Sequence, residues 1–387
     1  MDAKTAARAE IDASREHLLD LSHRIHAHPE LNFEEHQSSR WVADELERGG
    51  FDVDYGVCDL PTAFVATVGS GPLHIGICAE YDALPDIGHA CGHNIIAAAA
   101  AGAGLGLSRV ADDVGLTVTV LGTPAEEGGG GKIFMLERGA FAGIHAAMMV
   151  HPSSTEMDRM GCLAVSHFDV HYHGKAAHAS AWPEQGINAA DAITVAQTAI
   201  GLLRQHIRQT DRIHGIVLKG GEAPNVVPSH TVGRWLVRAR TMAELTTLEP
   251  RVRACFDAGA LATGCTVEVV PSGPVYSEMV TDDEIAAIYR ANAETIGRVF
   301  PDIPAAIRER TAGSTDMANV SLQIPTIHPM LGLDCFPAVN HQPEFTAACV
   351  GAVADQAVGD GAVGMAWTAI DLATRAAVRD RLLSRVG

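Results

Sequence analysis

The sequence predicts an α/β protein in which a mostly parallel sheet, covered by helices on both faces, is interrupted by a smaller α+β domain. The length of 387 residues suits two domains, or one large domain with an insertion. Near-continuous apolar runs alternate with helical segments before residue 163, which is typical of a parallel sheet. The pattern then changes to a period of two. We therefore expect residues 1–162 and 277–387 to form the larger domain and residues 163–276 the inserted one.

The larger domain begins with two predicted helices within the first 50 residues. Leu18, Leu21 and Ile25 recur at helical spacing until Pro29, and a second helical run ends at Gly49-Gly50. Short strands and helices then alternate. The expected strands are Thr62–Val68, Leu73–Ala79, Leu116–Leu121, Ala146–Val150 and Gln323–Pro329, the expected helices are Asn94–Arg109 and Lys132–Arg138, and a helical tail ends the chain.

The inserted domain opens with a strand, Leu163–Gly174, that alternates between apolar and polar residues. Its polar side holds His167, Asp169, His171 and His173, as expected for one half-buried strand of an antiparallel sheet. A helix (Asn188–Arg208), two strands (Ile213–Lys219, Val232–Arg240), a second helix (Ala243–Ala258) and a last strand (Thr266–Val270) follow. This order predicts a ferredoxin-like unit.

Composition excludes several classes of protein. The formal net charge is −19 and no cluster of Lys or Arg is present, which argues against a nucleic-acid partner and an anionic membrane surface. The longest uncharged stretch near the middle, Ile95–Ser108, is shorter than the roughly 20 apolar residues of a membrane span. The first residues lack the apolar core of a secretory signal. Eight scattered cysteines do not form a disulfide framework, so we expect reduced thiols and a cytoplasmic location.

Four segments with metal-ligand side chains follow predicted strands or begin a predicted helix. They are Ala79–Pro85, His89–Asn94, Glu126–Gly129 and His151-Pro152. Ligands of open parallel sheets bind beyond the carboxyl ends of the strands, so these segments can meet in one cleft. Thiolate and imidazole together suit zinc or a similar first-row metal. Each segment alone has an ordinary structural explanation, and only their conjunction favours a metal site.

The adjacent carboxylates Glu126 and Glu127 suggest hydrolytic chemistry. One can bind a metal while the other accepts a proton from water, whose pKa a metal lowers to about 7. No competing motif is present: the chain has no GxSxG nucleophile elbow, no recognisable Cys-His-Asn arrangement and no GxxxxGK[ST] phosphate loop. The sequence therefore favours metal-assisted hydrolysis.

With these motifs the chain resembles a known family, the dinuclear metal-dependent aminoacylases and carboxypeptidases of metallopeptidase family twenty. Within its amidohydrolase branch, the aminobenzoyl-glutamate hydrolases and aminoacyl-lysine-type dipeptidases are the most similar group. The matching segments are RIHAHPELNFEE (24–35), AEYDALPDIGHACGHN (79–94), TPAEEGGGGK (123–132), HGKAAHAS (173–180), APNVVPSH (223–230), GSTDMANVS (313–321) and NHQPEF (340–345). They span almost the whole chain.

The resemblance implies a role for each matching residue. The metal ligands are Cys91, His93, Glu127, His151 and His341, with Cys91 bridging two divalent ions, zinc or manganese. His93 and His151 are expected on one ion and Glu127 and His341 on the other. Glu126 is expected to be the general base. Where much of the family has His-x-Asp, this chain has Glu80-Tyr81-Asp82, so His93 replaces the missing imidazole and Asp82 orients a ligand.

The resemblance also implies that the inserted domain is a lid and a dimerisation domain. His178 matches a histidine that reaches the partner's active site in family dimers, and Asn225 and Arg238 match substrate-binding positions. Gly313 and Ser314 are assigned to substrate binding as well. We expect a homodimer. The strand Leu163–Gly174 is expected to lie at the edge of its sheet and to pair with its copy across a two-fold axis.

The function implied is hydrolysis of the amide bond of N-acyl- or aminoacyl-amino acids, with release of an amino acid. A true dipeptidase or carboxypeptidase is the alternative within the same class. A metal-binding protein that has lost its activity is the alternative from another class, but no ligand role requires the retained Glu126. A structural zinc site is disfavoured because such sites show paired CxxC-type spacing.

Overall fold

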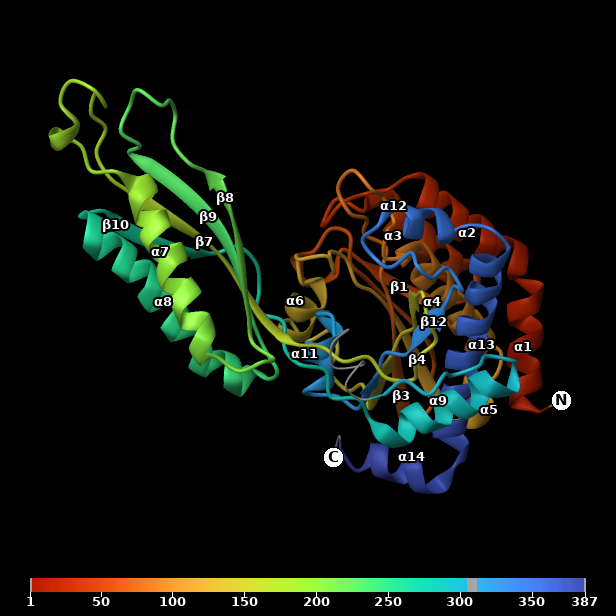
Figure 1. Cartoon of the computed structure of the whole chain (residues 1–387). Coiled ribbons are helices and arrows are strands. Elements are labelled where there is room, and N and C mark those ends of the chain that lie inside the picture. The colour runs from red at the N-terminus through yellow and green to blue at the C-terminus, as the bar shows by residue number, and fades with distance from the viewer. Residues whose placement is uncertain (1, 305–311, 386–387) are drawn as a thin grey trace. The chain divides into compact units, whose positions relative to one another are not determined.

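The computed structural model describes residues 2–304 and 312–385 and contains two compact units (Figure 1). The larger unit comprises Met1–Gly161 and Met279–Gly387, and the inserted unit comprises Cys162–Glu278. Among the described helices, none combines the length and the apolar character needed to cross a membrane.

The larger unit is built on a six-stranded sheet with the order β1-β2-β4-β3-β5-β11. Its strands are β1 (Asp52–Tyr55), β2 (Phe64–Gly69), β3 (Leu73–Ala79), β4 (Leu116–Gly122), β5 (Ala146–Met148) and β11 (Thr326–Ile327). β3 runs parallel to β4 and β5, and β5 runs parallel to β11. β2 is antiparallel to both of its neighbours. The largely parallel sheet predicted from the sequence is confirmed, with an antiparallel edge.

Both faces of this sheet are covered, since neighbouring residues of β3 enter different apolar clusters: Ile75 and Ile77 join one, and Cys78 the other. The helices are α1 (Ala3–Ala13), α2 (Arg15–Ala27), α3 (His36–Arg48), α4 (His93–Ser108), α5 (Ala111–Val114), α6 (Gly131–Glu137), α9 (Asp283–Thr295), α11 (Met317–Ser321), α12 (Pro343–Ala348), α13 (Ala352–Thr374) and α14 (Ala376–Leu383). α4 packs closely: a Cβ on Gly102 would lie 2.8 Å from Leu18 Cδ1.

Three local expectations are wrong. The N-terminal segment forms three helices, because the first predicted run divides at Ser14 between α1 and α2. The strand expected over Ala146–Val150 ends at Met148, and the chain then forms β6 (His151–Ser153), which pairs with β12 (Met330–Gly332) in a separate sheet. The strand expected over Gln323–Pro329 is confined to the two residues of β11. An apolar run cannot reveal where a chain leaves one sheet for another.

The inserted unit has the predicted ferredoxin-like order. Its elements are β7 (Ala164–His173), α7 (Ala189–Leu203), β8 (Arg212–Lys219), β9 (His230–Ala239), α8 (Met242–Thr263) and β10 (Thr266–Pro271). The four strands are antiparallel, in the order β10-β7-β9-β8. Phe168, Val170 and Tyr172 of β7 enter the core of this unit with Phe256 of α8.

The expectation that Leu163–Gly174 provides a free edge is wrong. β7 lies inside the sheet, hydrogen-bonded to β10 on one side and to β9 on the other. The edge strands are β10 and β8. Alternation shows which face of a strand is buried, but it does not show how many neighbours the strand has.

Candidate active site

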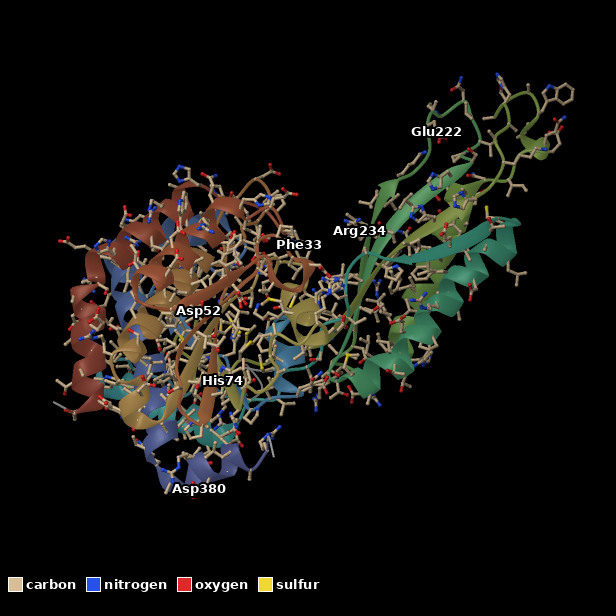
Figure 2. All side chains as sticks on the ribbon, turned by 180° about the vertical axis from the view of Figure 1, so that it is seen from behind. Phe33, Asp52, His74, Glu222, Arg234 and Asp380 are labelled. Atoms are coloured by element: carbon tan, nitrogen blue, oxygen red, sulfur yellow. The ribbon has the colours of Figure 1, made fainter. Side chains whose placement is uncertain are left out.

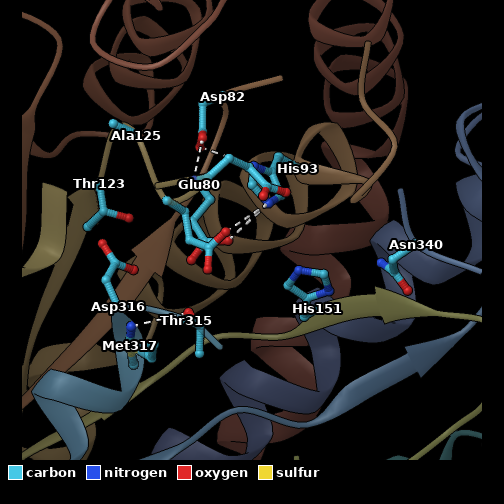
Figure 3. Close-up of polar contacts among 12 residues, drawn as sticks. Glu80, Asp82, His93, Thr123, Ala125, His151, Thr315, Asp316, Met317 and Asn340 are labelled. Carbon is cyan, nitrogen blue, oxygen red and sulfur yellow. Dashed lines mark hydrogen bonds and ion pairs between the residues drawn. The ribbon is translucent and has the colours of Figure 1, made fainter. Parts of the chain in front are cut away.

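The predicted site residues of the larger unit converge at the ends of three elements (Figure 3). Glu80 and Asp82 follow β3, His93 begins α4, and His151 begins β6. The turn before α4 depends on Gly92, which has a left-handed φ of 72°. A Cβ at that position would lie 2.8 Å from Pro152 Cγ, so glycine also permits the close approach of two site segments.

Three groups of side chains each place their ligand atoms within 4.8 Å of one another; one is Glu80, His93 and Glu126, and the other two contain Cys91. The first of these two is Cys91, His93 and His151, and the second is Cys91, Glu127 and His341. Cys91 belongs to both, which is the division implied by the family resemblance. The structure thus brings together all five proposed ligands.

The donor atoms fit a divalent ion. His93 Nε2 and Glu127 Oε1 are buried, and neither has a hydrogen-bond partner among the described residues. Buried polar atoms without partners are costly, and an ion between them would remove that cost. Thiolate, imidazole and carboxylate together suit a first-row divalent metal.

Hydrogen bonds outside the cluster orient its ligands. Asp82 Oδ1 lies 3.1 Å from His93 Nδ1, and Asp82 Oδ2 accepts the backbone N–H of Glu127 at 2.9 Å. The carbonyl oxygen of Pro152 lies 2.8 Å from His151 Nδ1. These contacts engage the Nδ1 atoms and leave Nε2 of both histidines for the cluster, in the way that metal-binding imidazoles are usually held.

The electrostatics of the cluster favour a bound cation. Burial and then the charge of Glu127 raise the pKa of the Cys91 thiol well above its usual range. The thiolate form therefore needs positive charge beside it. Burial and then the charge of Glu80 raise the pKa of Glu126 as well, and positive charge nearby would oppose this rise.

A fully buried ion network that the sequence analysis missed lies beside the cluster. Lys132 Nζ lies 2.5 Å from Glu80 Oε1 and 2.7 Å from Asp316 Oδ1. Burial disfavours the Lys132 cation, but the charges of Asp316 and Glu80 outweigh burial and raise its pKa. The available signal was a lone lysine at the start of a short helix in an otherwise apolar and glycine-rich segment.

The cluster opens into a cavity of about 580 Å³. Predicted residues that line it are Cys91, Glu126, Glu127, His151, Gly313, Ser314 and His341. Six further lining residues have apolar side chains, and we call this set the apolar wall: Met157, Met160, Ile303, Met330, Phe336 and Val339. The apolar wall was not predicted, because its members are spread over 183 positions of the chain, from 157 to 339.

His328 is a second unpredicted residue of the cavity. Its ring stacks on that of His151 with 5.4 Å between centroids. Burial and then His151 lower its pKa to about 3, so the ring is neutral. Neither ring nitrogen has a hydrogen-bond partner among the described residues. The signal in the sequence was a histidine directly after an apolar strand.

The remaining predicted residues lie in the inserted unit. His178 forms an isolated bridge with Val226, next to Asn225, whose carbonyl oxygen accepts the N–H of Ala179 at 3.0 Å. His178 Nδ1 accepts the N–H groups of Ser180 and Ala181, both at 3.3 Å, which favours a proton on Nε2. Arg238 lies on β9, opposite Val165 of β7. The structure therefore places His178 beside Asn225 in one loop region.

The chain is similar to several known proteins. The model of Peptidase family M20/M25/M40 matches residues 76–355. The Xaa-Arg dipeptidase of Mus musculus is 38% identical over 95% of this chain and 88% of its own length. One of the subunits of the p-aminobenzoyl-glutamate hydrolase of Escherichia coli (strain K12) is 35% identical over 67% of this chain and 58% of its own length.

Two solved structures have the same fold. An aminobenzoyl-glutamate utilization protein from Klebsiella pneumoniae superposes with a TM-score of 0.72 at 19% identity, over 93% of this chain and 97% of that one. A Bacillus subtilis protein described as a dinuclear metal binding peptidase has a TM-score of 0.65 at 22% identity, over 91% and 98%.

Proposed function

Since the chain belongs to peptidase family M20/M25/M40 and is a hydrolase of amide or peptide bonds, we propose that it cleaves N-acyl- or aminoacyl-amino acids with two divalent ions. The family and the ligand groups indicate divalent metal binding. The proposal includes two ions, zinc or manganese, with Cys91 as the ligand that they share. The single observation that carries it is the pair of ligand groups that share Cys91 beside Glu126.

The proposed mechanism gives each residue of the larger unit a distinct task. Bound divalent ions would supply Lewis-acid chemistry, which lowers the pKa of a water molecule and polarises a scissile carbonyl. Glu126 lines the cavity beside the ligands and takes the proton of the attacking water. It then delivers that proton to the leaving amine. Asp82 holds His93 and the backbone of Glu127 in place.

The lining of the cavity indicates which substrates the protein would accept. Its apolar wall of methionine, isoleucine, phenylalanine and valine side chains suits an apolar chain on the acyl half of the substrate. Methionine side chains adapt to chains of different shape. Asn225 and Arg238 are proposed to hold the carboxylate or the oxyanion of the substrate, and Gly313 and Ser314 are proposed to bind substrate as well. Acyl groups and apolar aminoacyl residues both fit this description, and the similarity to Xaa-Arg dipeptidases favours arginine as the leaving amino acid.

Lengthening the acyl chain of N-acyl-arginines from acetyl to hexanoyl is expected to raise kcat/KM about fourfold per methylene. The reason is that each buried methylene contributes about 0.8 kcal/mol. Met160→Ala is expected to flatten this dependence, because Met160 lines the apolar wall. The dependence on chain length is measured from initial rates over the series. Val299→Ala is the control variant, because Val299 is 78% exposed and lies outside the cavity.

An ω-aminohexanoyl-arginine substrate tests whether the apolar character of the acyl chain raises kcat/KM. A terminal ammonium against the apolar wall should make it a much poorer substrate than hexanoyl-arginine. If both are hydrolysed equally well, the acyl half does not occupy this wall. If Leu-Arg is hydrolysed but hexanoyl-arginine is not, the protein is a dipeptidase that requires a free α-amino group.

We propose that the protein is a homodimer that pairs through β8, in place of the edge expected from the sequence. β8 is an edge strand, and its residues Ile216, Val217 and Leu218 are 61%, 45% and 48% exposed. An edge with consecutive exposed apolar side chains favours strand pairing with a second copy. A two-fold axis beside β8 would join the two sheets.

Mixing His178→Ala protein with Glu126→Ala protein is expected to restore activity if His178 acts in the partner's site. At equal mixing and free exchange, half of the dimers are hybrids with one complete site, so activity per subunit reaches about a quarter of wild type. Activity is assayed after exchange has been verified with differently tagged subunits. An inactive hybrid would mean that His178 acts within its own chain or has no catalytic part.

A further inference from the structure

The open face of the sheet in the inserted unit holds three histidines and a carboxylate on three adjacent strands. We call this set the histidine face: His171 and His173 of β7, His230 of β9 and Glu268 of β10. His173 pairs with His230 across one ladder, and His171 pairs with Glu268 across the other. Paired residues project to the same side of a sheet, so all four side chains share one surface.

Packing of the sheet fixes this orientation. The intervening residue, Tyr172, is buried in the core of the unit, and its hydroxyl donates to the carbonyl oxygen of Phe256 at 2.9 Å. Because side chains alternate along a strand, His171 and His173 must both project away from that core. The backbone positions of the imidazoles are therefore set before any ligand binds.

One pair of ring nitrogens is already close to the spacing that a metal requires. His171 Nδ1 lies 3.1 Å from His230 Nε2. Two nitrogens bound to tetrahedral zinc at about 2.0–2.1 Å lie about 3.3 Å apart. The His173 and His230 rings are parallel, with 4.7 Å between centroids, so a third imidazole adjoins this pair.

His173 completes the set by a side-chain rotation. Its side chain is 48% exposed, which leaves it room to turn. Its Nε2 lies 4.0 Å from Glu268 Oε2, too far for a hydrogen bond, so the same rotation must bring the ring to the carboxylate, which is how proteins commonly orient a metal-binding histidine. Nδ1 is then the nitrogen available to a metal. Neighbouring charges are mutually paired: Lys219 with Glu222, and Asp169 with Arg234 on the next rung. Figure 2 labels Glu222 and Arg234 on this unit.

We propose that His171, His173 and His230 bind one zinc ion on this face, with Glu268 orienting His173. Three neutral imidazoles leave a fourth position of a tetrahedral ion open to water. The site joins β7 to β9 and, through Glu268, to β10. It involves none of the residues assigned to catalysis or to substrate, and it stands whether or not the proposed function holds.

The test is zinc content, measured by elemental analysis of full-length protein that has been stripped, reloaded with zinc and passed through gel filtration. Wild type is expected to retain one zinc per subunit more than His230→Ala and His173→Ala. Glu268→Gln is expected to weaken this extra zinc about 10–100-fold in a chelator competition. His214→Ala, an exposed histidine on β8 outside the set, is the matched control and should retain the wild-type content.

Equal zinc in wild type, His230→Ala and His173→Ala would overturn the proposal. So would an extra zinc that His214→Ala also loses, because binding would then not belong to the histidine face. Hydrolytic activity should be the same in His230→Ala as in wild type, which separates this ion from those of the candidate active site.

Discussion

Replacing Glu126 with alanine is expected to lower kcat by about 10²-fold or more while the metal content stays near that of wild type. Glu126 lines the cavity beside Cys91 and Glu127 but belongs to neither ligand group that contains Cys91. Its raised pKa, caused first by burial and next by Glu80, suits a group that accepts and returns a proton. Steady-state kinetics and elemental analysis of the same preparation measure both quantities.

The neighbouring carboxylate is the matched control. Glu127→Ala should lose metal together with activity, because Glu127 belongs to a ligand group with Cys91 and His341. Glu126 also adjoins Glu80 and His93 in a third group of potential ligands. Metal lost from Glu126→Ala, in step with its activity, would therefore make Glu126 a ligand and remove the proposed base.

Cys91→Ala is expected to lose at least one metal ion per subunit and most of the activity. Its sulfur belongs to both ligand groups, so its removal takes a ligand from each ion and the negative charge from between them. Cys91→Asp should keep part of both properties, since a carboxylate can bridge two ions too. Metal content by elemental analysis and kcat/KM on one substrate are the measurements.

Cys349→Ala serves as the control for the thiol substitution. Cys349 is also buried and lies close to the same turn, where a Cβ on Gly92 would be 3.1 Å from its sulfur. It belongs to no ligand group among the described residues, so this variant should keep its metal and its activity. A Cys91→Ala protein that stays fully loaded and active would contradict a bridging thiolate.

Much of the site was accessible from the sequence because its ligands occupy fixed places in a parallel sheet. Side chains that follow β3, begin α4 or follow β5 must emerge at one edge of the sheet, whatever the details of packing. The motifs around Cys91, Glu127 and His151 could therefore be placed together from the sequence alone. The ferredoxin-like order was accessible because β7 alternates between polar and apolar residues, whereas β3 and β4 are buried along nearly all of their lengths.

Features that depend on distant pairing were not accessible. The Lys132 ion network joins three segments, and Lys132 and Asp316 are 184 positions apart. Nothing in the local sequence of either residue indicates the other. His328 could not be predicted for the same reason. It lies against His151 because β12, which follows it, pairs with β6. β7 was wrongly expected to be an edge strand. The order of strands in a sheet depends on which strands pair, and the sequence of β7 alone does not show its partners.

The most direct test of the central claim is a metal titration of stripped protein, assayed with N-acyl-arginines and Xaa-Arg dipeptides. Zinc or manganese is added in steps, and hydrolysis is followed against the number of ions bound per subunit. The account predicts no hydrolysis by the stripped protein and a rise to full activity at about two ions per subunit in the candidate active site, measured in the His230→Ala background. Full activity in the stripped protein, or none of these amides hydrolysed by fully loaded protein, would contradict it.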